Sequence, residues 1–118
     1  MRKIGIVELN TTNVKMIFAD ILDNNSFVCT EKMCDSIRVA TDLAKDELIA
    51  PQTIANVGSI LKTYKSLCIA SQITEIYAVA NNEYTVAKNQ RSFFEELYSV
   101  SGFRFRVLSQ EEQLNNLY

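Results

Sequence analysis

The first residues that could do chemistry lie between two apolar segments near the start of the chain. Residues 7–21 read VELNTTNVKMIFADI, in which β-prone residues flank the short polar run ELNTTN. A tight hairpin at this run would display hydroxyls and amides at its tip, where they are able to hold a phosphate group. An ordinary turn fits the same residues equally well. The run therefore leaves a phosphate-binding hairpin and a plain turn as open alternatives.

The overall composition excludes several other kinds of chemistry. The chain has no histidine, so it lacks the commonest metal ligand and the usual general base at neutral pH. Its three cysteines have no CxxC spacing, which argues against a zinc site or a disulfide framework. A net charge of −2 gives no electrostatic reason to expect nucleic acid, and no apolar run is long enough to span a membrane. We therefore expect a cytoplasmic protein with neither nucleic acid nor membrane as a partner.

The first third of the chain is predicted to form an antiparallel meander. Apolar, β-prone runs alternate with short polar turns, as expected for strands joined by hairpins. The strands are expected at residues 3–8, 14–22 and 26–34. The run Asp-Asn-Asn at residues 23–25 supports a turn there, because these side chains bond their own backbone and tolerate a left-handed conformation.

The remainder of the chain is predicted to alternate helices and strands. Pro51 suits the first turn of a helix, where its missing N–H costs nothing, and an apolar stripe follows it at three- and four-residue steps. Ser109 and Glu112 form a capping box that opens the last helix. The expected elements are a helix of about five turns after Pro51, a strand at 75–80, a helix at 91–100, a strand at 103–108 and a helix at 109–118.

The order β-β-β, then α-β-α-β-α, predicts an α/β fold. Strand–helix alternation after a meander implies a mixed sheet with helices on both faces, which is the ribonuclease-H-like arrangement. We expect one domain over residues 1–118, and the ending of the chain at a helix is typical of a fragment of a longer protein. The predicted core is Ile4, Ile6, Val14, Met16, Phe18, Leu61, Tyr64, Ile76, Val79, Phe94, Leu97 and Val107.

Three stretches of the chain read together as a series of motifs. IGIVELNTTNVKMIFADI is similar to a hairpin of the form A-I-D-x-G-S-N-S-x-R-L. AVANNEYTVAKNQRSFFEEL resembles A-V-A-T-S-A-x-R-x-A-x-N before a phenylalanine-rich helix, and SGFRFRVLSQEEQLNNLY is similar to G-x-x-x-x-V-I-S-G-x-E-E-A-R-L-x-Y. No single motif is specific. Their succession resembles the exopolyphosphatase and guanosine pentaphosphate phosphohydrolase (Ppx/GppA) family over nearly the whole chain.

This resemblance implies an actin-like ATPase superfold and a phosphoric anhydride hydrolase. The complete enzymes have two such domains, with magnesium and phosphate bound in the cleft between them. The chain matches only the first domain, and the second phosphate loop, D-x-G-G-G-S, is absent from it. The implied partners are the missing C-terminal domain and a phosphate-rich substrate, either polyphosphate or guanosine pentaphosphate.

The resemblance also assigns residues to a phosphate and metal site. Glu8 takes the place of an aspartate that would bind magnesium through water. The phosphate-binding positions fall on Asn10, Thr11, Thr12, Asn13 and Lys15. Asn10 replaces a glycine, and Asn is the non-glycine residue that best tolerates positive φ. We therefore expect Asn10 to hold a glycine-like positive φ.

Departures from the family pattern weaken the implied catalysis. The arginine of A-V-A-T-S-A-x-R falls on Thr85, and the glutamate implied as general base falls on Gln113, whose amide cannot accept a proton. Glu111 and Glu112 are the nearest candidate catalytic carboxylates. The capping box is expected to use Glu112. Adjacent side chains on a helix point about 100° apart, so neither neighbouring carboxylate points where Gln113 does.

Three functions remain open from the sequence. The first is the N-terminal domain of a Ppx/GppA-type phosphohydrolase, which would hydrolyse phosphoanhydrides with magnesium. The second is a regulatory relative that keeps the fold and some anion affinity without turnover. The third is a scaffold that forms a homodimer through a sheet edge or a helix face. The fold alone does not separate these three functions. The losses at Asn10, Thr85 and Gln113 favour the second function for this chain's own chemistry, because they remove groups that catalysis would need.

Overall fold

A computed structural model describes residues 2–115 of the chain and the side chains of residues 2–112. Its centre is a five-stranded sheet in the order β3-β2-β1-β4-β5. The strands are β1 (Arg2–Leu9), β2 (Asn13–Ile21), β3 (Phe27–Ser36), β4 (Glu75–Ala80) and β5 (Arg106–Val107). β1, β2 and β3 pair antiparallel, whereas β4 pairs parallel to β1 and β5 parallel to β4. The predicted meander and mixed sheet are confirmed.

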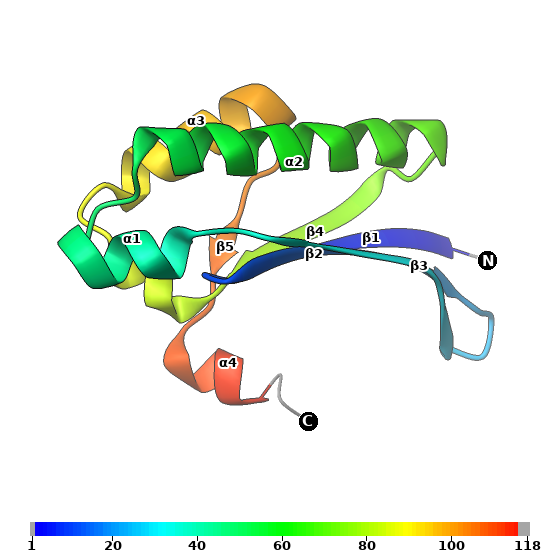
Figure 1. The fold of residues 1–118 in the computed structure, drawn as a ribbon. Coiled ribbons are helices and arrows are strands. Elements are labelled where there is room, and N and C mark those ends of the chain that lie inside the picture. Colours follow the sequence, from blue (N-terminus) through cyan, green and yellow to red (C-terminus); the bar gives the residue numbers. More distant parts are fainter. Residues whose placement is uncertain (1, 116–118) are drawn as a thin grey trace.

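Helices complete the α/β fold that the sequence predicts. They are α1 (Val39–Asp46), α2 (Pro51–Ala70), α3 (Gln90–Ser101) and α4 (Gln110–Asn115), with a short 3₁₀ helix η1 (Asn82–Val86) after β4. In Figure 1, α2 and α3 lie over one face of the sheet, and α4 lies on the opposite side, beyond the end of β5. No helix within residues 2–115 is long and apolar enough to cross a membrane.

The ends of the helices follow the local sequence. Pro51 is the first residue of α2, and Gly102 caps α3 in the left-handed conformation with φ 77°. The hairpin between β2 and β3 likewise turns at Asn25, whose φ is 66°. Each of these residues has a backbone preference that suits its place, so local and global structure agree.

The core lies between α2, α3 and the face of the sheet that they cover. The predicted core residues Val14, Met16, Phe18, Leu61, Tyr64 and Leu97 are buried. Ile76, Phe94 and Val107 are partly buried and pack against the same cluster. The predicted stripe of α2 is therefore confirmed as the surface that packs on the sheet.

The prediction for the core side of β1 and β4 was wrong at Ile4, Ile6 and Val79. Val7 and Leu9 are buried instead, while Ile4 and Ile6 lie on the opposite face and remain half-buried. Both alternating sets of β1 are apolar, so period-2 alternation alone does not choose between them. Glu8 shares the face of Ile4 and Ile6, and it was the signal that marks this face as the one away from the core.

Three parts of the chain differ from the predicted elements. Helices α1 and η1 were not predicted, since each is short and lacks a long apolar stripe. β5 has two residues rather than six, because Phe103 and Phe105 pack into the aromatic cluster before the strand begins. Helix α4 begins as predicted, and residues 116–118 of that prediction lie outside the described residues.

Tyr64 joins α2 to the two antiparallel strands at the sheet edge. Its hydroxyl donates to the Asp35 carboxylate at 2.6 Å and lies 3.2 Å from the Val14 carbonyl oxygen. Burial raises the pKa of Tyr64, and the carboxylate of Asp35 raises it further. The phenol is therefore a neutral hydrogen-bond donor that fixes the helix over the sheet.

Candidate functional site

The turn between β1 and β2 is closed by Asn10 and Asn13. The Asn10 backbone N–H donates to the Asn13 carbonyl at 2.9 Å, and the Asn10 side-chain amide donates to the Asn13 side-chain oxygen at 3.0 Å. Among the described residues, positive φ occurs at Asn25, Glu47, Gln72 and Gly102. Asn10 therefore has a negative φ, and the expectation of a glycine-like backbone at this position was wrong. The two asparagines hold the turn through side chains instead.

Three hydrogen bonds from the rest of the protein hold the turn. The Thr11 carbonyl accepts from Ala40 N–H at 2.8 Å, and the Thr12 carbonyl accepts from Ile37 N–H at 3.0 Å. The Tyr84 hydroxyl donates to the Asn10 carbonyl at 2.7 Å. Burial raises the pKa of Tyr84, so its phenol stays protonated and able to donate. The turn is consequently part of the packed structure rather than a free loop.

The Thr11 hydroxyl already has an anionic partner within the chain. Thr11 is 4% exposed, and its Oγ1 donates to Oε2 of Glu83 at 3.2 Å. Glu83 lies in η1, where its backbone N–H donates to the Asn81 side-chain oxygen at 2.7 Å. The backbone N–H of Asn81 in turn donates to the Leu9 carbonyl at 2.9 Å. A chain of hydrogen bonds thus fixes the Glu83 carboxylate beside the hydroxyl predicted to bind phosphate.

The other predicted residues of the hairpin do not converge on Thr11. Glu8 and Lys15 are directly opposite each other in the register of β1 and β2, on the face away from the core. Thr12 is exposed at the tip of the turn, and Asn13 is half-buried against Asn10. The structure therefore divides the predicted phosphate and metal residues between the turn and the far face of the sheet.

The carboxylate of Glu112 caps α4 and pairs with Arg106, so it is not available as a general base. Its carboxylate accepts from Ser109 N–H, and the Ser109 hydroxyl accepts from Glu112 N–H, each at 3.1 Å. This is the predicted capping box, and it is confirmed. Arg106 also forms an ion pair with Glu112 and lowers the pKa of that carboxyl, with a further contribution from Ser109. Glu111 is exposed, and the side chain of Gln113 lies outside the described residues.

The donor set does not fit a magnesium site held by this chain alone. No group of three or more His, Cys, Asp or Glu side chains within the described residues is placed to hold a metal ion. Lys15 is directly opposite Glu8 in the strand register, so its positive charge competes with a cation for the carboxylate. The predicted magnesium site therefore has one carboxylate, that of Glu8, and the positive charge of Lys15 opposite it disfavours a bound cation.

Three site residues were missed from the sequence: Asn81, Glu83 and Tyr84. They follow β4, whose carboxyl end lies beside that of β1 because the two strands are parallel. A polar run at this position was a usable signal, since carboxyl ends of neighbouring parallel strands meet at one edge. The particular contact between Thr11 and Glu83 was not predictable, because it depends on the path of η1.

Comparison with known proteins supports the fold and gives no sequence relative. No family model matches the chain, and no curated protein matches it in sequence. Solved structures do match. A Ppx/GppA family member from Aquifex aeolicus superposes with a TM-score of 0.89 at 19% identity, over 95% of this chain and 36% of that chain.

Two further structures match in the same way. An exopolyphosphatase from Cytophaga hutchinsonii has a TM-score of 0.83 at 10% identity, over 91% of this chain and 34% of that chain. An exopolyphosphatase-like protein has a TM-score of 0.87 at 16% identity, over 97% of this chain and 34% of that chain. The chain thus spans about a third of the proteins it resembles, and it has the fold that this third adopts in Ppx/GppA structures.

Proposed function

We propose that this chain is the N-terminal actin-like domain of a Ppx/GppA-type phosphohydrolase whose own phosphate site has become inactive. The likeness of the fold to exopolyphosphatase structures and the order of the three motifs support the first part. The hydrogen bond between Thr11 and Glu83 supports the second part and carries the proposal. In the parent enzymes the substrate would be polyphosphate or guanosine pentaphosphate, with magnesium supplied at the cleft.

Electrostatic repulsion makes the turn a poor phosphate site. A phosphate that accepted a hydrogen bond from Thr11 would lie beside the carboxylate of Glu83, which the same hydroxyl now contacts. Two unit charges about 4 Å apart repel by about 1 kcal/mol in water and about 4 kcal/mol near a protein surface. The position implied for an arginine offers no compensation, because the Thr85 hydroxyl donates to the Asn82 carbonyl at 2.8 Å.

The residues near the implied base do not restore hydrolysis. Activation of water requires a group that accepts a proton near neutral pH. The amide of Gln113 does not do so, and Glu112 is held by Arg106 and by the N-terminus of α4. We therefore infer that the chain does not hydrolyse a phosphoanhydride.

Weak anion binding without turnover is the second candidate function. The exposed hydroxyl of Thr12 at the tip of the turn favours it, because this group is accessible while Thr11 is buried. A regulatory domain of this kind would sense phosphate-rich molecules through surface contacts. It would depend on Thr12 rather than on Thr11.

A phosphate-release assay tests the proposal. The purified chain is incubated with magnesium and either polyphosphate or guanosine pentaphosphate, and free phosphate is measured over time. We expect no release above the rate without protein. Thr11→Ala serves as the site variant and Thr12→Ala as its matched control on the same turn. Release that Thr11→Ala abolishes and Thr12→Ala preserves would refute the inactive site.

A further inference from the structure

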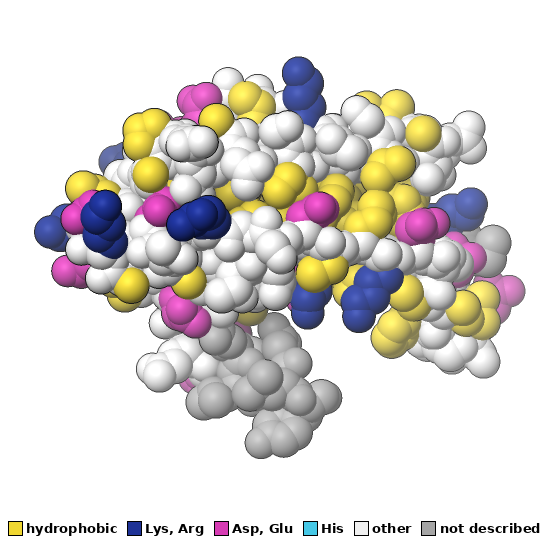
Figure 2. Space-filling model, in the orientation of Figure 1, with side chains coloured by type: hydrophobic (Ala, Val, Ile, Leu, Met, Phe, Trp, Pro, Cys, Tyr) yellow, Lys and Arg dark blue, Asp and Glu magenta, His cyan; other side chains and the backbone are white. Residues whose placement is uncertain are grey.

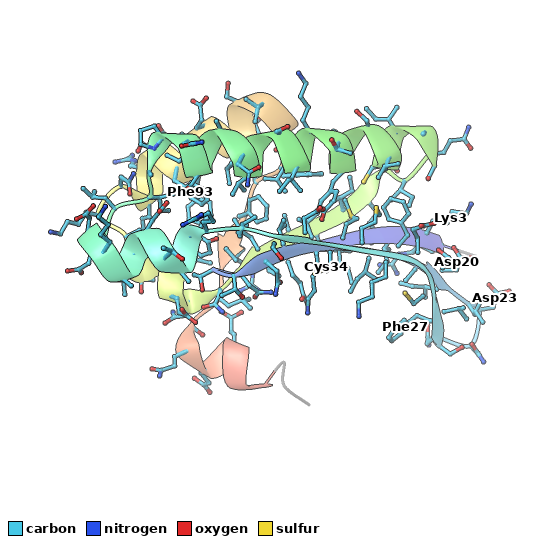
Figure 3. All side chains as sticks on the ribbon, viewed as in Figure 1. Lys3, Asp20, Asp23, Phe27, Cys34 and Phe93 are labelled. Carbon is cyan, nitrogen blue, oxygen red and sulfur yellow. The ribbon has the colours of Figure 1, made fainter. Side chains whose placement is uncertain are left out.

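A polar pocket, called here the α1–α2 pocket, lies between α1 and the first turns of α2. Its volume is about 470 Å³, which is within the range of small-molecule sites. Figure 2 shows acidic and basic side chains close together at the end of the molecule where α1 lies. In Figure 3, side chains of α1 and of the start of α2 extend toward each other near the labelled Phe93. Apart from Ala50, the described residues that line the pocket are all polar or charged: Arg38, Asp42, Gln52, Thr53 and Asn56.

The side chain of Thr53 is the strongest sign of a ligand in this pocket. Thr53 is 8% exposed and lines the pocket, and its hydroxyl forms no hydrogen bond with any described residue. No fully buried side-chain oxygen or nitrogen within the described chain lacks a hydrogen-bond partner, so the Thr53 oxygen opens onto the pocket. A polar group that folding has almost removed from solvent, and that faces a pocket without a partner, is suited to a ligand.

The backbone of α2 adds two further donors beside this hydroxyl. The first hydrogen bond of the helix runs from the Ile54 N–H to the Ala50 carbonyl at 3.0 Å. The N–H groups of Gln52 and Thr53 precede it and have no partner among residues 2–115, as expected in the first turn of a helix. These N–H groups and the positive end of the helix dipole favour a bound anionic group. The guanidinium of Arg38, which forms no ion pair with any described residue, lines the same pocket.

A carboxylate fixed at the start of α2 gives the pocket an acceptor for positive charge. Oδ2 of Asp42 accepts from the Ala50 N–H at 3.0 Å, and its other oxygen forms no hydrogen bond with the described residues. Asp42 therefore lies at the same helix end as the donors, where it would repel a simple anion such as phosphate. A ligand that suits this pocket carries a negative group for the end of α2 and a positive group for Asp42.

A second pocket with an apolar side adjoins the α1–α2 pocket. Asp42 and Ala50 line both pockets. The apolar side of the second pocket is formed by Leu48, Pro51 and Ile54, and Leu48 is 45% exposed. A ligand whose positive group contacts Asp42 is therefore able to place an aliphatic group against these side chains, which removes apolar surface from water.

We propose that the α1–α2 pocket binds a free α-amino acid with an aliphatic side chain. The α-carboxylate accepts from the N–H groups of Gln52 and Thr53 and from the Thr53 hydroxyl, with the guanidinium of Arg38 beside it. The α-ammonium donates to Asp42, and the side chain packs against Leu48 in the second pocket. The two charged groups of an amino acid are attached to one carbon, which matches donors and a carboxylate gathered at one helix end. This site is separate from the turn between β1 and β2 and does not depend on hydrolysis.

Titration calorimetry of the 118-residue chain with L-leucine, L-isoleucine and L-valine provides the first test. We expect a dissociation constant on the order of 0.1–1 mM for the best of the three, as for a ligand of this size. Leucinamide lacks the carboxylate and N-acetyl-leucine lacks the ammonium, so each should bind at least about tenfold more weakly than leucine. No binding of the three amino acids up to about 10 mM, equal binding of either analogue, or displacement of leucine by inorganic phosphate would overturn the proposal.

Variants of the pocket provide a second test with the same ligand. Asp42→Asn removes the charge but keeps an acceptor for the Ala50 N–H, and it should weaken leucine binding at least about tenfold. Thr53→Val removes the hydroxyl at constant shape and should weaken binding about three- to tenfold. Glu96→Gln on α3 and Thr63→Val on α2 are the matched controls, because both residues are exposed and neither lines the two pockets. Unchanged affinity in either pocket variant, or equal losses in the controls, with all four folded by circular dichroism, would overturn the proposal.

Discussion

Replacing Asn10 with glycine tests how the turn between β1 and β2 is held. Asn10 has a negative φ, so glycine relieves no backbone strain and instead adds freedom to the unfolded chain, which costs about 0.4–1 kcal/mol. The substitution also removes the 3.0 Å hydrogen bond from the Asn10 amide to Asn13, which contributes about 0.5–1.5 kcal/mol. Both effects have the same sign. We expect Asn10→Gly to lower the free energy of unfolding by about 1–2 kcal/mol, measured by urea denaturation.

The same substitution at Asn25 is the matched control. Asn25 turns the β2–β3 hairpin with φ 66°, where a non-glycine residue is strained. Asn25→Gly should therefore leave the free energy of unfolding unchanged or raise it by up to about 1 kcal/mol. A gain in stability for Asn10→Gly, or equal losses at both sites, would refute the assignment of the turn to side-chain hydrogen bonds.

Three further outcomes follow from the core and its buried phenols. Leu61→Ala should lower the free energy of unfolding by about 2–5 kcal/mol, since Leu61 is fully buried where α2 packs on the sheet, and a loss near zero in denaturant titration would contradict that packing. Tyr84→Phe should cost about 1–3 kcal/mol by leaving the Asn10 carbonyl without its donor, whereas Tyr98→Phe, at an exposed site on α3, should change little. The native state raises the pKa of Tyr64 above its ordinary value of 10.0, so the phenol ionises more readily in the unfolded chain. The free energy of unfolding should therefore fall as the pH rises above about 10. Tyr64→Phe should weaken this dependence in thermal melts from pH 9 to 11.

Most of the fold was predictable because its signals are local. Pro51 and Gly102 mark helix ends, and the stripe of α2 marks the face that packs on the sheet. The covered face of β1 was not predictable from alternation, because Ile4 and Ile6 are as apolar as Val7 and Leu9. Burial depends on where α2 and α3 lie, and that is a property of the tertiary structure.

The candidate site was harder to predict than the fold. The hairpin and the capping box were found from residue types, and the structure contains both. The partner of Thr11 was not found, since Glu83 is 72 residues away in the chain and reaches Thr11 only through the path of η1. A sequence pattern identifies the residues of a turn, but it does not show which other group of the protein already forms hydrogen bonds with them.

Titration calorimetry of pyrophosphate binding tests most directly whether Glu83 blocks the turn. We expect the unmodified chain to bind more weakly than about 10 μM, and Glu83→Ala to bind at least about tenfold more tightly, which corresponds to about 1.4 kcal/mol of relieved repulsion. Glu83→Gln should give a similar gain, because it removes the charge and keeps an acceptor for Thr11. Glu95→Ala, on the exposed surface of α3, controls for the change in net charge. Binding by the unmodified chain tighter than about 10 μM, or equal affinity in Glu83→Ala, would contradict a turn occupied by its own carboxylate.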